Sequence, residues 1–403
     1  MTEDAYDIVI CGGGLVGTTL ALCLAHLPLS IALIEPQPQA PKRSPDDRTF
    51  TLAQGSKRAL SALGVWSRLA DGSFHAITEI EVSDRRGRFG LAHILAREQG
   101  VEALGYVTEN AALLEALYST IATTAVKVIK GRFLALERQA LTAVVTLDGS
   151  EGPARVKGRL VIGADGTRSA VRAACGIGVS LREYGRHAIV ANCQVSQPLP
   201  HTAFERFAPH GPIAALPLGQ DRYTFVISRP DAPQWQAFDD EQFLVELEAA
   251  FGTRLGRFLA AGRRQSFPLT LQLAETAVAA RVAIIGNAAH TLHPVAGQGF
   301  NLGLRDAAVL ADHIAAALRT SEDYGSLEFL QTYADKRTAD TRATVRFTDG
   351  LVRLFSLDVG PIAWARNLAL TCVDCLPPVK HALAQRTMGL KGPLPRLMRG
   401  LKP

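Results

Sequence analysis

Three glycines near the start of the chain follow one another at a defined spacing. Gly12, Gly14 and Gly17 fit the pattern G-x-G-x-x-G. The first glycine permits a tight turn, the second lets the backbone approach a pyrophosphate, and the third permits close packing of a helix. Glu35, further along, could accept hydrogen bonds from ribose hydroxyls, and an acid there disfavours a 2′-phosphate. These residues predict a site for NAD or FAD, with a glycine-rich turn that binds nothing as the alternative.

Two later segments also place polar residues beside glycine after an apolar run. The segment 161–166 reads VIGADG and puts Asp165 on a tight turn, and the segment 286–303 contains both GNAAH and GQGFNLG. His290 and His293 in the second segment are three residues apart, which could suggest metal ligands. No carboxylate or cysteine in that motif completes a metal site, so we expect no metal.

The elements that must position these motifs are short apolar runs. Tyr6–Cys11 and Ile31–Ile34 flank a helical pattern over 15–27, which predicts a β-α-β unit. The runs 159–163 and 282–286 show the same change from strand to glycine. Continuously apolar strands are typical of parallel sheets covered on both faces. We therefore predict an α/β fold with a Rossmann-like domain built from separated pieces.

The segments between these pieces have a different pattern. Alternation in 141–147 and 223–227, with proline-containing turns, indicates antiparallel strands of a second, inserted domain, and the chain beyond about Tyr333 is helical in pattern. We expect a cofactor-binding domain in 1–75, 101–176 and 276–325, a substrate domain in 76–100 and 177–275, and a C-terminal helical region in 326–403.

The composition is that of a packed globular protein. The 403 residues are 47% hydrophobic and 20% charged, which excludes a disordered chain, a collagen and a small disulfide scaffold. The net charge of +5 is too small to indicate nucleic-acid binding. The apolar stretch 8–34 is interrupted by His26, Pro28 and glycines, and no basic segment precedes it. We expect a soluble cytoplasmic protein.

The cysteines and the C-terminal charges have their own patterns. Six dispersed cysteines favour a reducing compartment, and for Cys372 and Cys375, the one C-x-x-C pair, we expect a packing role, with redox or metal chemistry as the alternative. No acid follows Asp374. Six cations do follow it: Lys380, Arg386, Lys391, Arg396, Arg399 and Lys402. Such a tail fits docking to a membrane or a partner, and a solvated surface is the alternative.

Taken together, the three motifs resemble the FAD-dependent aromatic hydroxylases of the para-hydroxybenzoate hydroxylase type. Their order and separation match that family over nearly the whole chain. The segment His290–Asp306 is similar to the signature of its ubiquinone-biosynthesis branch. The segments 82–85, 203–212 and 383–387 are similar to members of that branch that act on 2-polyprenyl-6-methoxyphenol. Asn287 stands where most of the wider family has aspartate.

The resemblance implies particular site residues. Arg48 would contact FAD near its phosphates or ribityl chain, and the loop 294–301 would pass the isoalloxazine ring. His210 and His290 are each either structural or involved in proton handling. The residues expected at the reacting centre are Pro294, Gly297, Gly299, His210 and His290. Those expected to bind the cofactor are Gly12, Gly14, Gly17, Glu35, Arg48, Asn110, Asp165, Gly286, Asn287, Gly297, Gly299, Phe300 and Asn301.

The resemblance also implies a monooxygenase. NAD(P)H or another reductant would reduce FAD, O₂ would add at the flavin C4a, and the hydroperoxide would hydroxylate a prenylated phenol such as 2-polyprenyl-6-methoxyphenol. An insoluble substrate of this kind must come from a membrane surface or a lipid-binding protein, so the enzyme is expected to lie at the inner membrane. The alternatives are a sister hydroxylase acting at another ring position, a different flavin chemistry, and a non-catalytic lipid carrier or scaffold. Oligomeric state, including a homo-oligomer, stays open.

Overall fold

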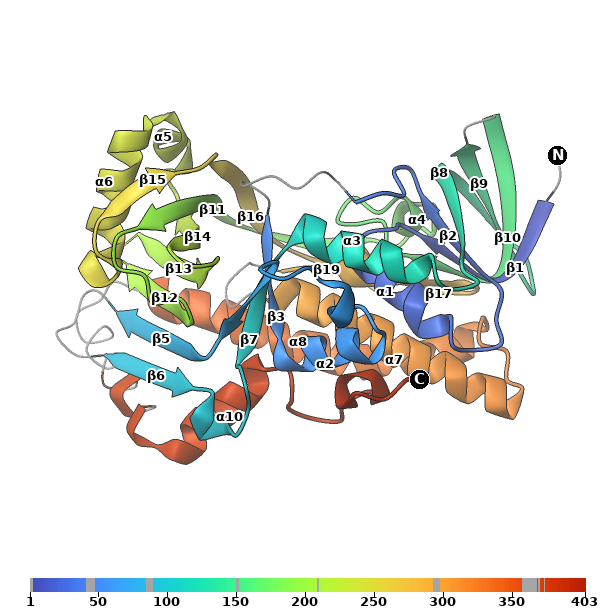
Figure 1. The fold of residues 1–403 in the computed structure, drawn as a ribbon. Coiled ribbons are helices and arrows are strands. Elements are labelled where there is room, and N and C mark those ends of the chain that lie inside the picture. Colours follow the sequence, from blue (N-terminus) through green and yellow to red (C-terminus); the bar gives the residue numbers. More distant parts are fainter. Residues whose placement is uncertain are drawn as a thin grey trace.

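The computed structural model describes residues 3–40, 48–84, 90–149, 152–208, 210–292, 298–356, 368, 370–372 and 374–403. Figure 1 shows two large sheets toward opposite ends of the molecule, with the long helices α7 and α8 running beneath and between them. The fold is α/β, with a Rossmann-like domain, an inserted sheet domain and a helical C-terminal region, as the sequence predicts.

A seven-stranded sheet carries the three glycine-containing motifs. β1 (Glu3–Cys11) lies between β2 (Ile31–Glu35) and β10 (Gly152–Gly163) and runs parallel to both. Because the carboxyl ends of parallel strands share one edge, the motifs that follow β1, β10 and β18 meet there. The other strands of this sheet are β8 (Lys127–Arg138), β9 (Ala143–Gly149), β17 (Val278–Ala279) and β18 (Val282–Ile284).

Helices cover one face of this sheet. α1 (Leu15–Leu24), α3 (Asn110–Ile121) and α7 (Gln298–Thr320) pack on the side chains of Ile10 and Leu33. Nine of the ten α1 residues are buried, which explains why its sequence lacks a polar stripe. This layer fixes the N-terminal ends of α1 and α7 at the edge of the sheet where the motifs lie.

The alternating segment 141–147 lies in the first sheet, within the range 101–176 expected for the cofactor-binding domain, so the interpretation of its alternation as a strand of the inserted sheet is wrong. β9 is antiparallel, as expected, but it pairs with β8 and β10. Its residues Val145 and Leu147 are buried against Val9 of β1. Alternation reports that one face of a strand is covered, and it does not say which sheet provides the partners.

A nine-stranded sheet forms the inserted domain. Its strand pairs are antiparallel except for β12 and β5, which run parallel. One face packs through Phe225 against helices α5 (Ala232–Ala237) and α6 (Asp240–Phe251). The strands are β5 (Glu79–Asp84), β6 (Leu91–Leu95), β11 (Val179–Val195), β12 (Thr202–Ala208), β13 (Gly211–Pro217), β14 (Arg222–Arg229), β15 (Phe258–Ala261), β16 (Gln265–Ala274) and β19 (His290–Thr291).

A small third sheet connects the two large ones. It contains β3 (Thr49–Ala53), β7 (Gly105–Glu109) and β4 (Phe74–Ile77), and α2 (Gln54–Ala62) follows β3 directly. The Thr49 hydroxyl donates a hydrogen bond to that of Thr224 on β14, at 3.2 Å. β3 therefore lies against the face of the nine-stranded sheet that α5 and α6 leave uncovered.

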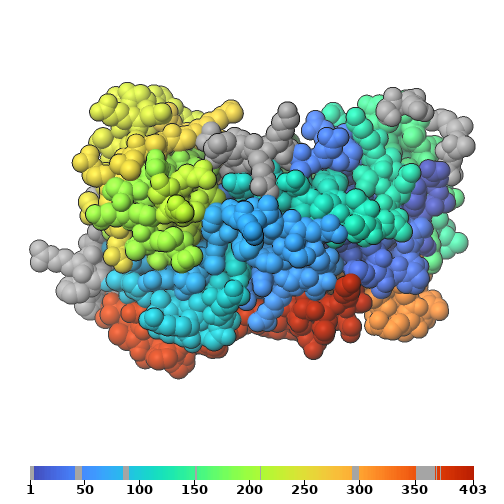
Figure 2. Space-filling model, viewed as in Figure 1, coloured from blue at the N-terminus to red at the C-terminus, as the bar shows by residue number. Residues whose placement is uncertain are grey.

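The C-terminal region is helical, as predicted. α8 (Leu327–Ser356), α10 (Pro377–Thr387) and the short η6 (Arg396–Arg399) follow α7. Figure 2 shows this segment, in red, beneath the residues of β5, β6 and α2. Leu397 is fully buried in the main core, so the basic end of the chain is part of the folded structure. In the part of the chain that the structure describes, no helix is long and apolar enough to cross a membrane.

The packing role expected for the C-x-x-C pair is wrong. Cys372 and Cys375 are both exposed, whereas Cys11, Cys23 and Cys193 are buried. Apolar neighbours in the sequence suggested burial, but the two cysteines lie at the surface. Within the described ranges, no group of three His, Cys, Asp or Glu side chains is placed to hold a metal ion.

Candidate active site

Of the three motif glycines in the loop after β1, the middle one has free space where a side chain would begin, and the other two do not. Gly12 has a φ of +111°, and a Cβ there would meet the carbonyl oxygen of Ala164 at 2.4 Å. A Cβ on Gly17 would meet the Gly12 oxygen at 1.9 Å. No atom lies within 4 Å of a Cβ built on Gly14, at the N-terminal end of α1. The protein itself requires the first and third glycines, whereas the second faces a space that suits an anion at a helix N-terminus.

Glu35 holds this loop from the end of β2. Its Oε2 accepts a hydrogen bond from the backbone N–H of Gly13 at 2.7 Å. The hydroxyl of Tyr118 on α3 donates to the Gly13 carbonyl at 2.9 Å. Burial and the charge of Glu35 raise the pKa of Tyr118, so its hydroxyl stays a donor. Each carboxylate oxygen can accept a second hydrogen bond, which leaves Glu35 able to bind a ribose.

Asp165 has one oxygen that the protein satisfies and one that it does not. Its Oδ2 accepts hydrogen bonds from the N–H groups of Ala170 and Val171, at 2.7 and 3.1 Å, at the start of α4 (Ala170–Ala174). Its Oδ1 is buried and has no partner among the described residues. A buried acceptor without a donor is costly, so this atom fits a ligand that brings a hydroxyl group.

Asn287 follows the neighbouring strand. β18 lies beside β10 with Gly163 opposite Ile284, and Asn287 comes just after it in the turn Gly286–Ala288 with its side chain exposed. Asp165 and Asn287 are thus brought to adjacent strand ends at the edge that carries the Gly14 space. These positions suit a long ligand laid along the carboxyl edge of the sheet.

Arg48 and Asn110 lie together beside the third sheet. The N–H of Asn110 donates to the carbonyl of Arg48 at 2.8 Å. The Arg48 side chain is exposed, and its guanidinium lies 5.2 Å from the ring centre of Phe267 on β16. Arg48 therefore bridges the cofactor-binding domain and the inner face of the nine-stranded sheet.

His290 belongs to a buried ionic network. Its Nε2 lies 2.6 Å from Oδ2 of Asp306 on α7, and the same oxygen accepts the N–H of Gly286 at 2.9 Å. Arg337 on α8 donates from Nε to Oδ1 of Asp306 at 2.7 Å. Nδ1 of His290 is buried without a partner among the described residues. The network ties the Gly286 turn to α7 and α8.

The start of α7 is held by Asn301. Its Oδ1 accepts hydrogen bonds from the Ala53 N–H and the Ser56 hydroxyl, at 2.8 and 2.7 Å, and its Nδ2 donates to the Thr51 carbonyl at 2.9 Å. Phe300 is buried against Phe50, with ring centres 5.8 Å apart. These two side chains support the first turn of the helix, whose backbone N–H groups lack acceptors within it.

The remaining predicted residues are less informative. A Cβ on Gly299 would meet no atom within 4 Å. Pro294 and Gly297, like His293, lie outside the described residues. The side chain of His210 is exposed on the turn between β12 and β13, and its carbonyl accepts a hydrogen bond from Arg186. The catalytic and cofactor-binding roles of the predicted site residues stay predictions.

Glu205 was assigned no role by the sequence analysis. Its neighbour Phe204 packs toward α6, so alternation along β12 places Glu205 on the inner face of the sheet, the face that β3 contacts. It is paired with Ala214 of β13, which is in turn paired with Val226 of β14. The residue is half-buried, and this burial raises the pKa of Glu205 to about 7. Glu205 is the one acid in β12, whose sequence is TAFERFA, and an acid between the aromatic residues of a strand was the signal in the sequence.

Comparison with known proteins gives a consistent result. The family described as FAD binding domain matches residues 5–348. Ubiquinone hydroxylase UbiL of Rhodospirillum rubrum is 40% identical over 99% of this chain and 94% of its own length. The 3-demethoxyubiquinol 3-hydroxylase of Escherichia coli is 32% identical over 97% of this chain and 100% of its own length.

More distant matches extend this result. The human mitochondrial ubiquinone biosynthesis monooxygenase COQ6 is 29% identical over 95% of this chain and 92% of its own length. The crystal structure of p-nitrophenol 4-monooxygenase PnpA from Pseudomonas putida superposes with a TM-score of 0.80 at 16% identity, covering 97% of this chain and 99% of that one. At that identity the likeness shows a shared fold.

Proposed function

The chain belongs to the FAD-binding-domain family and is an FAD-dependent aromatic hydroxylase, and from this premise we propose that it hydroxylates the ring of a polyprenylated phenol in ubiquinone biosynthesis. The observation that carries the cofactor assignment is the open space at Gly14, at the same sheet edge as the unpartnered Asp165 oxygen. The names of the relatives support the substrate class.

The residues present fit FAD. The N-terminal end of α1 at Gly14 would hold the pyrophosphate, Glu35 the adenosine ribose, and Asp165 with Asn287 the ribityl chain. Arg48 would lie near the phosphates or the ribityl chain. When bound, FAD supplies the activation of O₂ and the transfer of one oxygen atom, which amino-acid side chains cannot perform. The protein binds and orients FAD and the substrate, and it excludes water from the site.

We propose that Glu205 is the base that accepts the proton of the phenol. A phenolate ring is more electron-rich than a phenol, so a base that takes this proton assists oxygen transfer. A carboxylate with a pKa of about 7 can accept a proton near neutral pH, and Ala214 and Val226 give it an apolar setting. His290 is less suited, because its Nε2 is held by Asp306. Its role in this proposal is to position the Gly286 turn.

For the substrate itself we propose 2-polyprenyl-6-methoxyphenol. A second candidate is hydroxylation at another ring position, and the name of the Escherichia coli relative, a 3-demethoxyubiquinol 3-hydroxylase, favours it. Both substrates are prenylated rings that place an apolar tail and a polar hydroxyl in one site. The inner face of the nine-stranded sheet offers both kinds of neighbour, with Glu205 among alanine and valine side chains.

An insoluble substrate requires a source. We propose that the protein takes it from the inner membrane or from a lipid-binding partner, and that NAD(P)H is the reductant. Leu376 and Val379 beside Lys380 are 50% and 45% exposed, which suits contact with an apolar surface. A homo-oligomer is compatible with this arrangement.

The test is a product assay on the purified, FAD-loaded protein. Aerobic incubation with NADH or NADPH and 2-polyprenyl-6-methoxyphenol is expected to yield a product heavier by one oxygen atom, and NMR would locate the new hydroxyl. Product formed from demethoxyubiquinol alone would select the second candidate. If the protein binds flavin but neither substrate increases its O₂ consumption, the proposed hydroxylation is contradicted and a non-catalytic scaffold is favoured.

A further inference from the structure

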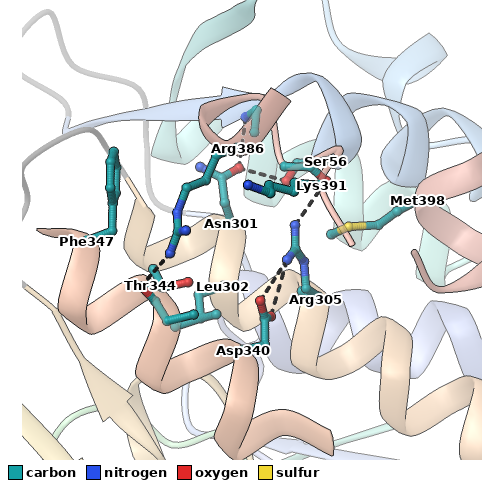
Figure 3. A pocket seen from close by; sticks show the side chains of 13 residues that line it. Ser56, Asn301, Leu302, Arg305, Asp340, Thr344, Phe347, Arg386, Lys391 and Met398 are labelled. Carbon is teal, nitrogen blue, oxygen red and sulfur yellow. Dashed lines mark hydrogen bonds and ion pairs between the residues drawn. The ribbon is translucent and has the colours of Figure 1, made fainter. Parts of the chain in front are cut away.

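A pocket of about 220 Å³ lies where the C-terminal segment crosses α7 and α8. Figure 3 shows Arg305 and Asp340 projecting from the two helices, and Arg386 and Lys391 approaching from the C-terminal segment. Leu302, Phe347 and Met398 provide apolar walls. Ala53 and Ser56 also line it, so four separate parts of the chain contribute to one small, mostly basic space.

Two of the three basic side chains, those of Arg305 and Arg386, are held in place by the protein. Arg305 donates from Nη1 to both oxygens of Asp340, at 3.0 and 3.2 Å, and from Nη2 to the Gly389 carbonyl at 2.9 Å. Arg386 donates to the Ala343 carbonyl at 2.5 Å. Its guanidinium lies 4.9 Å from the ring centre of Phe347. Two guanidinium groups are therefore fixed before any ligand arrives, which lowers the entropy cost of binding.

The positive charge in the pocket exceeds what its acid neutralises. Asp340 is shared between Arg305 and Arg337, whose Nη1 donates to its Oδ2 at 2.5 Å. Nε of Arg305 is buried with no partner, and Lys391 has no ion pair among the described residues. Counting Arg305, Arg386 and Lys391 against Asp340 leaves an excess of two positive charges. The complementary ligand is an anion of about two charges.

The volume limits the size of that anion. Pockets for drug-sized ligands have roughly 300–1,000 Å³, and a water molecule takes roughly 30 Å³. A space of about 220 Å³ accommodates a phosphate group with a short organic extension and is too small for a dinucleotide. Arginine pairs and lysine are the usual partners of phosphate oxygens.

We propose that this pocket binds a phosphate monoester group, with Arg305, Arg386 and Lys391 as its ligands. Asn301 and Ser56, which line the pocket, are hydrogen-bonded to each other and hold the start of α7. An occupant would therefore fasten the C-terminal segment to the helix that begins beside the proposed flavin site. The phosphate could belong to a soluble metabolite or to a lipid headgroup, and the two sources are separable by experiment.

The experiment uses the full chain loaded with FAD. Inorganic phosphate is titrated at constant ionic strength against potassium chloride, with ³¹P NMR and thermal unfolding as readouts. Saturable binding is expected for the wild type. Lys391→Gln should weaken it about tenfold, since it removes one charge-assisted contact. The matched control is Arg399→Gln, which removes an exposed cation of the same tail that does not line the pocket.

Vesicles separate the two sources of phosphate. Flotation with phosphatidic acid, against phosphatidylcholine, identifies a lipid headgroup if the protein is retained and Lys391→Gln releases it while Arg399→Gln does not. Phosphate binding without retention on vesicles identifies a soluble phosphorylated compound. Equal weakening by both substitutions, or equal stabilisation by chloride, would overturn the proposal, because either result indicates diffuse electrostatics without a defined site.

Discussion

Asp306 accepts a hydrogen bond from the ring of His290 at 2.6 Å, and both side chains are almost completely buried. Burial alone would raise the pKa of Asp306, but the charges of His290 and Arg337 and the hydrogen bonds from His290 and Gly286 outweigh it and lower the pKa to about 2. The carboxylate is thus ionised in the folded protein. It connects the Gly286 turn at one end of the proposed flavin site to α7 and α8.

Replacing Asp306 by asparagine should destabilise the fold. The change leaves Arg337 without one of its two carboxylate partners, and breaking a buried pair costs about 3 to 5 kcal/mol. Arg337 retains Asp340, so we expect about 3 kcal/mol at pH 7. Chemical unfolding of the flavin-free protein measures this loss of unfolding free energy. Glu137→Gln, in the exposed pair with Arg155, is the control and should change stability by less than about 0.5 kcal/mol.

The same carboxylate predicts a pH dependence. The pKa of Asp306 falls from its ordinary 3.8 to about 2 in the folded protein, so its contribution is fully present above about pH 4 and is lost as the pH falls through 2. The shift corresponds to about 2 kcal/mol. The stability difference between wild type and Asp306→Asn should therefore shrink by about that amount between pH 4 and pH 2. A difference that stays constant over this window would contradict the assignment.

Gly14→Val should remove the cofactor and spare the fold. The backbone of Gly14 is extended, which valine adopts readily, and its Cβ would meet no protein atom within 4 Å. The side chain would instead occupy the space for the pyrophosphate. We expect a protein that unfolds like flavin-free wild type and has lost flavin absorbance. Gly17→Val is the contrasting variant, since its Cβ overlaps the Gly12 oxygen and should prevent folding. A Gly14→Val protein that still binds flavin, and is therefore yellow, would contradict the assignment of the pyrophosphate site.

The arrangement of the motifs could be predicted from the sequence because it depends on local patterns. Apolar runs before Gly12, Asp165 and Gly286 indicate parallel strands, and parallel strands bring their carboxyl ends to one edge. Glycine spacing then identifies the position where backbone must approach a ligand. These inferences need no knowledge of which strands are neighbours.

The contacts that complete the site depend on residues far apart in the chain. Tyr118 reaches the Gly13 carbonyl across 105 positions, and Asn301 reaches the Ala53 N–H across 248. No periodicity or spacing encodes such pairs. The same limit explains Cys372 and Cys375, because apolar neighbours in the sequence do not determine which face of a surface segment meets solvent.

Glu205→Gln should slow hydroxylation and stabilise the protein at alkaline pH. The folded-state pKa of about 7 lies above the ordinary 4.5, so the wild type loses stability as the pH rises from about 4.5 through 7. The amide avoids burying a charge and should stabilise by about 1 to 2 kcal/mol at pH 8, allowing for partial exposure. Product formed per O₂ consumed should fall, because the phenolic proton has lost its acceptor.

Two measurements separate a catalytic Glu205 from a structural one. Thermal unfolding at pH 6 and pH 8 measures the stability cost of burying the Glu205 charge. The rate of hydroxylation as a function of pH tests whether Glu205 acts as the base. Glu241→Gln, on the exposed side of α6, is the control and should alter neither. Wild-type coupling of oxygen consumption to product in Glu205→Gln would remove this residue from the mechanism.

The basic C-terminal segment should be required for stability, which changes how its role is tested. Truncation after Leu376 would delete the fully buried Leu397 together with Met388 and Met398, which are about 1% exposed, so loss of membrane or partner association in such a protein could follow from unfolding. Leu397→Ala alone should cost about 2 to 5 kcal/mol. Lys402→Ala, at the exposed end, should change stability by less than about 0.5 kcal/mol. Equal unfolding temperatures for the two variants would show that the tail is not packed into the core.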